Sequence, residues 1–258
     1  MTEAPSAEVL RAFELDGRPE VLAGGPGGAY RVGDVVLKRA GNPDEIDWSA
    51  GVLASLPNSA FRVPRYLQGD AGACVVDGWF AQTWLEGAHD FDRWSDVLDV
   101  CAAFHEALQG LEAPAFIAQR SHPWAVADRM AWGEETLTYA PPLAELAQPL
   151  AERLAAVESA NQVIHGDFSG NVLFAEGSPP AVIDFTPYWR PASFARAIVV
   201  IDALTWHNAD ISLIDHLAND AETEQLLLRA ELRRLLELDQ QERQHVATST
   251  GSLRRIAE

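Results

Sequence analysis

The sequence has little cysteine, little basic charge and no long apolar run. Its two cysteines, Cys74 and Cys101, are expected on a strand and a helix, so neither a disulfide framework nor a cysteine metal site is indicated. Lys and Arg number 19 against 38 Asp and Glu, which gives a formal net charge of −19. Because binding to nucleic acid requires a basic face that neutralises phosphates, this balance argues against a nucleic-acid partner.

Segments that target or anchor a protein are lacking too. The N-terminal stretch has neither the basic region nor the apolar core of a signal peptide, and no uncharged apolar run approaches the ~18 residues needed to span a bilayer. We therefore expect a cytoplasmic protein with no membrane partner. The 258 residues, 48% of them hydrophobic, suffice for one large or two modest globular domains. The acidic excess is compatible with a cationic small substrate, although a soluble acidic surface explains it more simply.

A glycine-rich stretch precedes the first strong strand signal. Four glycines fall within residues 24–28, and so bare a backbone can approach a phosphate closely with its N–H groups, although a plain hairpin is the commoner explanation. A Gly33-Asp34 turn then leads into the apolar run Val35-Val36-Leu37, which ends at Lys38. This pattern predicts a β-hairpin whose second strand carries a lysine.

A helix is predicted from Asn42 onward, with a capping residue, a proline at its first position and acids in its first turn. Glu45 heads an otherwise apolar stripe on this helix, and Asp47 is the weaker partner for Lys38. Strands are predicted at 73–76 and 79–85, and helical periodicity begins at Trp94. We therefore expect two parts, an N-terminal part of residues 1–87 and a mainly helical C-terminal part of residues 88–258.

The stretch 162–186 combines a loop and a hairpin that carry oxygen-bearing side chains. Apolar strands at 172–174 and 181–183 flank a turn at 176–180. If Phe174 lies opposite Ala181, Asn171 lies opposite Asp184, and Asp167 is one short loop upstream. Hard oxygen ligands of this kind suit Mg²⁺.

Three later segments are expected to be helical or buried. A helix is predicted at 143–158, another at 195–206 in which Asp202 must find hydrogen-bond partners, and a third from about residue 220 that buries four leucines. The aromatic residues 185–191 are predicted to form a loop that either packs as a structural plug or forms a wall of a substrate pocket. His105 is expected to be a core residue.

The order of these features resembles the aminoglycoside phosphotransferase and choline kinase-like branch of the protein-kinase-like fold. The motifs that carry the likeness are His165-Gly166-Asp167, Asn171 and Ile183-Asp184-Phe185, and the likeness extends over roughly residues 20–206. The runs 170–174 and 187–191 further resemble an uncharacterised actinobacterial group. The resemblance implies an α+β, bilobal protein-kinase-like fold, with an N-terminal antiparallel sheet plus one helix as the nucleotide-binding lobe and a helical C-terminal lobe with the catalytic loop and substrate pocket.

The resemblance also implies a role for each matching residue. Asp167 would accept or orient the proton of the acceptor hydroxyl, and Asn171 and Asp184 would hold Mg²⁺ against the phosphates of ATP. His165 and the buried Asp202 would support the catalytic loop. The remaining contacts to ATP would come from Lys38, held by Glu45, from the hinge residues Thr83 and Leu85, and from the glycines Gly25, Gly27 and Gly28.

One departure from the family pattern concerns the catalytic loop. Four residues normally separate the catalytic Asp from the metal-binding Asn, but only three separate Asp167 from Asn171. The shorter loop must turn more tightly, which Gly170 would permit.

Three functions remain open at this point. The leading one is a Mg·ATP-dependent phosphotransferase that acts on a hydroxyl of a small molecule, such as an amino sugar or another cationic metabolite. The second is a nucleotide-binding regulator or pseudokinase with little turnover, which the short loop favours. The third and poorest is a two-metal phosphoesterase that uses His165, Asp167 and Asp184, since no second ligand cluster is visible.

Overall fold

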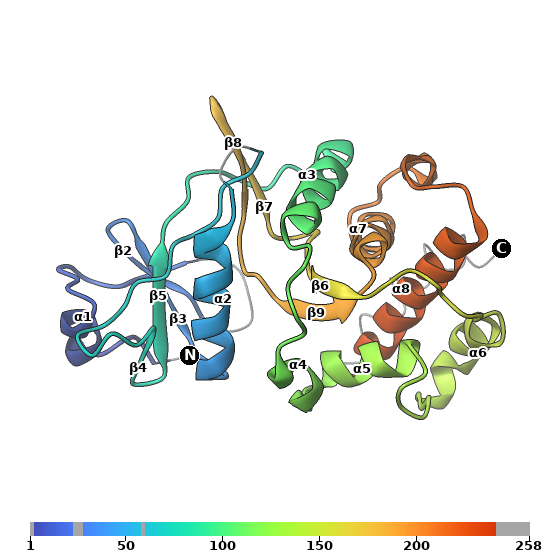
Figure 1. Cartoon of the computed structure of the whole chain (residues 1–258), viewed down its shortest axis with the longest axis horizontal. Coiled ribbons are helices and arrows are strands. Elements are labelled where there is room, and N and C mark those ends of the chain that lie inside the picture. The colour runs from blue at the N-terminus through green and yellow to red at the C-terminus, as the bar shows by residue number, and fades with distance from the viewer. Residues whose placement is uncertain (1–2, 23–27, 58–59, 241–258) are drawn as a thin grey trace. The chain divides into compact units, whose positions relative to one another are not determined.

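The structure is a computed structural model that describes residues 3–22, 28–57 and 60–240. The chain folds into two units (Figure 1). The first consists of the chain up to Ala88 together with Leu173–Ile183, and the second of His89–Val172 and the chain from Asp184 onward.

The expected division assigned residues 173–183 to the C-terminal part, whereas the structure groups them with the first unit. Phe174 exchanges two backbone hydrogen bonds with Ala88, at 2.9 and 3.0 Å. On the other side of the hairpin, the N–H of Arg62 donates to the carbonyl of Pro180, and the N–H of Val182 donates to the carbonyl of Arg62, both at 2.8 Å. The hairpin is therefore paired on both edges with the first unit. These partners are distant in sequence, so local patterns did not indicate them.

The first unit is built on a five-stranded antiparallel sheet in the order β1-β2-β3-β5-β4. Its strands are β1 (Glu20–Val21), β2 (Tyr30–Val32), β3 (Val35–Arg39), β4 (Val75–Val76) and β5 (Trp79–Thr83), and its helices are α1 (Ala7–Ala12) and α2 (Pro43–Ser55). One apolar cluster joins α1 to the sheet through Val9, Phe13, Tyr30, Leu37 and Trp79.

Two local signals of the first unit are confirmed, whereas the strands expected at 73–76 and 79–85 are shorter, Val75–Val76 and Trp79–Thr83. Val32 pairs with Val35, so Gly33-Asp34 is a two-residue hairpin turn, and Gly33 takes the left-handed φ of +58° that this turn requires. Asn42 caps α2, because its Oδ1 accepts from the N–H of Asp44 at 3.0 Å.

The hairpin of 172–182 is tighter than predicted. Strand β7 (Val172–Ala175) and strand β8 (Ser178–Val182) are joined by Glu176-Gly177 alone, so the five-residue turn is wrong. Two prolines lie inside β8, where Pro180 accepts a hydrogen bond and need not donate one. The expected register, with Phe174 opposite Ala181, depended on the longer turn and loses its basis.

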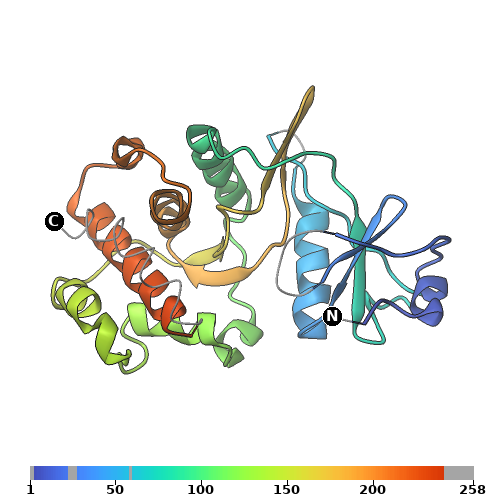
Figure 2. The ribbon, with the colours of Figure 1, turned by 180° about the vertical axis from the view of Figure 1, so that it is seen from behind.

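The second unit is mainly helical (Figure 2). Its helices are α3 (Trp94–Ala107), α4 (Ala115–Gln119), α5 (Pro123–Ala131), η1 (Pro141–Leu143), α6 (Ala144–Glu152), α7 (Ala192–Trp206), η2 (Ile211–His216) and α8 (Ala221–Gln240). Strand β6 (Gln162–His165) pairs with β9 (Pro187–Arg190), with His165 opposite Pro187. Within the ranges described, no helix combines the length and the apolar character needed to cross a membrane.

Two expectations for the second unit are corrected. The expected aromatic loop is strand β9 from Pro187 to Arg190, because it pairs with β6. The helix expected at 143–158 ends at Glu152, since the backbone beyond it bonds to α8 instead: the N–H of Ala155 donates to Gln225 Oε1, and that of Glu158 donates to Glu222 Oε2.

Helix α8 packs against α5, α6 and α7 (Figures 1 and 2). The four leucines predicted to be buried are buried: Leu228, Leu232, Leu235 and Leu236. Because neighbours cover this helix on several sides, charged side chains are buried with them: Arg229, Glu231, Arg233 and Glu237. A buried charge needs a partner, so this helix must pair its charges with each other and with its neighbours.

Candidate active site

Lys38 and Glu45 lie on neighbouring elements of the first unit. Lys38 is half-buried in β3, opposite Phe80 of β5, and Glu45 is half-buried in the first turn of α2. Asp47, the weaker partner considered for Lys38, accepts a hydrogen bond from the N–H of Cys74 at 3.3 Å. The roles of Lys38 and Glu45 stay predictions.

Of the remaining residues predicted to bind the nucleotide, Gly25 and Gly27 lie outside the described residues. Gly28 has a left-handed φ of +67° and leads through Ala29 into β2. Thr83 ends β5 and exchanges two hydrogen bonds with Arg65, one through its backbone N–H and one through its Oγ1. Leu85 follows two residues later and is half-buried.

The strand before the catalytic loop is fixed by two buried histidines. His105 donates from Nδ1 to the carbonyl of Cys101 at 2.6 Å and accepts at Nε2 from the N–H of His165 at 3.0 Å. Burial lowers the pKa of His105 to about 3, so this ring is neutral and keeps one tautomer. His105 is thus a core residue, as expected.

His165 supports the loop itself. Its side chain is fully buried, and its Nδ1 accepts from the N–H of Asp167 at 3.2 Å. This geometry agrees with a structural role for His165. It argues against the phosphoesterase alternative, which needs this ring as a metal ligand.

The loop is closed by Asn171. Its Nδ2 donates to the carbonyl of Asp167 at 2.6 Å and lies 3.4 Å from Asp167 Oδ2, and its N–H donates to the carbonyl of Phe168 at 3.1 Å. The side-chain oxygen Oδ1, which would bind a metal, is outside these hydrogen bonds. The three-residue spacing therefore keeps Asp167 and Asn171 adjacent.

Gly170 is not needed for the tight turn, which corrects the expectation. It lies outside the left-handed region, and a Cβ at this position would meet no atom within 4 Å. Gly166, in contrast, is required by a close approach. A Cβ there would lie 2.2 Å from Cδ2 of Tyr188, so the aromatic ring of β9 rests directly on the loop backbone.

Asp184 approaches the same end of the β6–β9 pair from the other strand. It is exposed and has a left-handed φ of +52°. Two residues later, the carbonyl of Thr186 accepts from the N–H of Gly166 at 2.9 Å. His165 pairs with Pro187 in the β6–β9 ladder. Asp167 follows His165 by two residues, and Asp184 precedes Pro187 by three, so both extend from the same end of this strand pair.

The residues present fit a Mg²⁺ site shared with phosphate. Asp184 and Asn171 offer hard oxygen donors, and Mg²⁺ is commonly held by one or two carboxylates together with phosphates and waters. Throughout the described ranges, no three His, Cys, Asp or Glu side chains gather as a metal cage.

Asp167 lines a cavity of about 490 Å³, and its side chain is 55% exposed. The other side chains lining the cavity come from α5, the loop, α7 and α8, and include Trp124, Ser169, Asp202, Trp206, Arg234 and Glu237. Asp202 finds the partners that its burial demanded, since Ser169 Oγ donates to it and Arg234 donates from Nε and Nη2, both at 2.6 Å.

Two arginines of α8 contact the catalytic loop, and sequence reasoning missed both. Arg233 donates from Nη2 to the carbonyl of Gly166 at 3.1 Å and lies over the ring of Tyr188 at 4.6 Å. Arg234 Nη2 is 3.6 Å from Asp167 Oδ1. The available signal was indirect: buried Asp202 required a donor, and the leucine-rich helix offered adjacent arginines.

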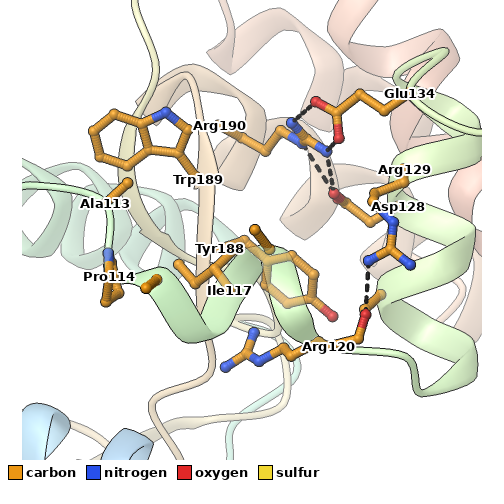
Figure 3. A pocket seen from close by; sticks show the side chains of 13 residues that line it. Ala113, Pro114, Ile117, Arg120, Asp128, Arg129, Glu134, Tyr188, Trp189 and Arg190 are labelled. Carbon is orange, nitrogen blue, oxygen red and sulfur yellow. Dashed lines mark hydrogen bonds and ion pairs between the residues drawn. The ribbon is translucent and has the colours of Figure 1, made fainter.

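A second cavity of about 350 Å³ lies against β9, α4 and α5 (Figure 3). Arg190 donates two hydrogen bonds to Glu134, at 2.6 and 2.8 Å, and also donates to Asp128; Figure 3 marks these contacts. Among the described residues that line it, none is a predicted catalytic or metal-binding residue. Tyr188 and Trp189 line this cavity.

Comparisons with known proteins agree with this arrangement. A family model described as the phosphotransferase enzyme family matches residues 22–188. Among curated protein sequences, none matches this chain significantly. The narrower likeness to an actinobacterial group stays a prediction.

Three solved structures share the fold at low identity. A choline/ethanolamine kinase family protein from Mesorhizobium loti is 18% identical with a TM-score of 0.60, over 93% of this chain and 87% of that one. A spectinomycin phosphotransferase in complex with ADP and spectinomycin is 15% identical with a TM-score of 0.58, over 96% and 92%. A mutant aminoglycoside phosphotransferase in a ternary complex with AMP-PNP and hygromycin B is 16% identical with a TM-score of 0.60, over 96% of both chains.

The expected α+β, protein-kinase-like fold is confirmed by these likenesses. Because the family model spans well over half of the 258 residues and includes Asp167, Asn171 and Asp184, this chain belongs to the phosphotransferase enzyme family.

Proposed function

We propose that the protein is a Mg·ATP-dependent phosphotransferase that moves the γ-phosphate of ATP to a hydroxyl of a small molecule. The observation that carries this proposal is the exposed Asp167 carboxylate, which lines a cavity of about 490 Å³ while its loop is held by His165 and Asn171. Membership of the phosphotransferase family supports the reaction class.

In this proposal, the acceptor hydroxyl enters the cavity and donates a hydrogen bond to Asp167. Its oxygen forms the new bond to the γ-phosphorus, the bond from phosphorus to the ADP oxygen breaks, and the hydroxyl proton passes to the carboxylate of Asp167. Asn171 and Asp184 would hold Mg²⁺, which supplies neutralisation of phosphate charge when bound. Lys38, kept in place by Glu45, would contact the α- and β-phosphates. Phosphoryl transfer depends mainly on positioning and charge neutralisation, which such a set supplies.

The acceptor site favours a neutral, polyhydroxylated molecule over a strongly cationic one. Arg234 engages both Asp202 and Glu237, and Arg233 pairs with Glu237 as well, so these two carboxylates of the cavity are compensated by two arginines. Trp124 and Trp206 are each 43% exposed and line the same cavity, and such flat apolar faces suit the ring of a sugar or cyclitol. The acidic composition therefore does not by itself specify a cationic substrate.

The test combines binding and turnover. ATP with Mg²⁺ should raise the melting temperature of the purified protein, and ADP should form when sugars, cyclitols and amino sugars are offered. If nucleotide binds but neither transfer nor slow ATP hydrolysis occurs, the pseudokinase alternative replaces this proposal. The absence of any nucleotide-dependent stabilisation would contradict both.

A further inference from the structure

Arg234 lies between the catalytic loop and the buried acid beneath it. Its guanidinium donates to Asp202 from two nitrogens at 2.6 Å, and Nη2 is also 3.6 Å from Asp167 Oδ1. Asp202 in turn accepts from Ser169 Oγ, which lies midway along the short loop. One side chain of α8 is thus linked to the loop at two points.

The charge of Arg234 is firmly held. Burial alone would lower the pKa of its guanidinium, but the carboxylates of Asp202 and Glu237 more than offset this, so the pKa lies well above its ordinary value. The side chain is only 12% exposed. The guanidinium group of Arg234 is therefore held in one position, whereas the guanidinium of a surface arginine is mobile.

The two oxygens of Asp167 face different partners. Oδ2 lies 3.4 Å from Asn171 Nδ2, and Oδ1 lies 3.6 Å from Arg234 Nη2. Asn171 lies within residues 22–188, which match the family model, whereas Arg234 lies beyond them. The orientation of this carboxylate thus depends on a helix outside the matched segment.

We propose that Arg234 is a positioning residue for the phosphotransferase reaction: paired with Asp202, it holds the three-residue loop through Ser169 and orients the carboxylate of Asp167 toward the acceptor. The inference rests on the proposed function, because it assigns Asp167 the role of proton acceptor. A one-residue shortening of the loop makes such a brace useful, since fewer loop residues remain to fix the angle of Asp167.

The test uses variants that separate positioning from folding. R234Q alone leaves Asp202 buried without its cation, so the double variant D202N/R234Q removes both charges together. R234K keeps the charge but loses the two-nitrogen fork. R229K is the matched control, because Arg229 is another buried arginine of α8 whose hydrogen bonds go to Gln225 and Ala155.

For D202N/R234Q, we expect kcat to fall about 10- to 100-fold while the KM for Mg·ATP stays within about twofold, since the misplaced group acts on the acceptor. Amide exchange of residues 166–171 should accelerate, and R234K should recover part of kcat. R229K should leave kcat and loop exchange unchanged. A folded double variant with wild-type kcat or wild-type loop exchange overturns the inference.

Failure of the proposed function has a different signature. If the wild type neither transfers phosphate nor hydrolyses ATP, the proposed function is wrong, and loop exchange still decides whether Arg234 positions Asp167. Faster exchange in the double variant then supports the positioning role, and unchanged exchange contradicts it.

Discussion

The loop of residues 165–171 and helix α8 contribute to the same cavity. They differ in how far this contribution can be predicted from their sequences. The loop carries His165, Asp167 and Asn171 in a recognisable order. We propose that Asp167 and Asn171 present oxygens to the reaction, while buried His165 holds the loop backbone. Helix α8 contributes Arg234 to the cavity, and Arg233 donates to the loop backbone, but both lie in a leucine-rich run that has the pattern of an ordinary amphipathic helix. The groups proposed to perform the chemistry are therefore visible in the sequence, while the arginines that contact the loop emerge only from packing.

The largest effect should come from the loop side of this comparison. Replacing Asp167 by Asn removes the proton acceptor at little structural cost, because the side chain is 55% exposed. We expect kcat to fall about 10²- to 10⁴-fold, with the nucleotide-dependent shift of the melting temperature retained. ADP formation measures the loss. Turnover within a few-fold of wild type would remove Asp167 from its assigned role.

On the α8 side, the largest effect should be on stability. Arg233 is 2% exposed, pairs with Glu237 at 2.9 Å and donates to the carbonyl of Gly166. R233M leaves Glu237 with one cation fewer in a buried place, and we expect a loss of about 3–5 kcal/mol in the free energy of urea unfolding. The double variant R233M/E237L should recover part of it. A cost below about 1 kcal/mol would show that this pair does not anchor α8 to the loop.

Two glycines of the loop give a sharper contrast. G166A places a Cβ 2.2 Å from Cδ2 of Tyr188, and such overpacking should cost about 1–3 kcal/mol of stability. G170A is the control, because its Cβ would meet open space, and its stability should change by less than about 0.5 kcal/mol. Equal unfolding free energies for the two variants would contradict the packing of Tyr188 on the loop.

A charge of α8 away from the loop should give a gradual effect that builds up with pH. Burial raises the pKa of Glu231 to about 8, so the folded protein keeps a proton that the unfolded chain releases near pH 4.5. The stabilisation is complete below about pH 4.5 and is lost as the pH rises through 8, by at most about 1.4 kcal/mol per pH unit. E231Q should therefore gain stability relative to wild type between pH 5 and 8 in urea unfolding. A pH-independent difference would contradict this.

Local chemistry predicted the parts of the fold that depend on neighbours in sequence. Gly33-Asp34 specified a hairpin turn, Asn42 specified a helix start, and buried Asp202 specified that partners must exist. Contacts between distant segments were not predictable in this way. The hairpin 172–182 joined the first unit because Ala88 and Arg62 pair with its two edges, and β9 formed because β6 supplies a partner.

The candidate site shows the same division. Asp167, Asn171 and Asp184 were chosen from their order and residue types. Only the packed structure shows that Arg234 is the donor to Asp202. Only the packed structure shows, too, that the loop does not need a glycine at position 170. A helix whose leucines point to several neighbours buries charges as well, and periodicity alone does not say which charge meets which partner.

The most direct measurement follows a radiolabelled γ-phosphate of ATP into a panel of sugars, cyclitols and amino sugars, with Mg²⁺ or with a chelator. We expect a labelled acceptor whose formation requires both Mg²⁺ and Asp167, and less of it when Arg234 and Asp202 are replaced together. Bound nucleotide with no label in any acceptor and no released phosphate would contradict the proposed phosphotransferase activity.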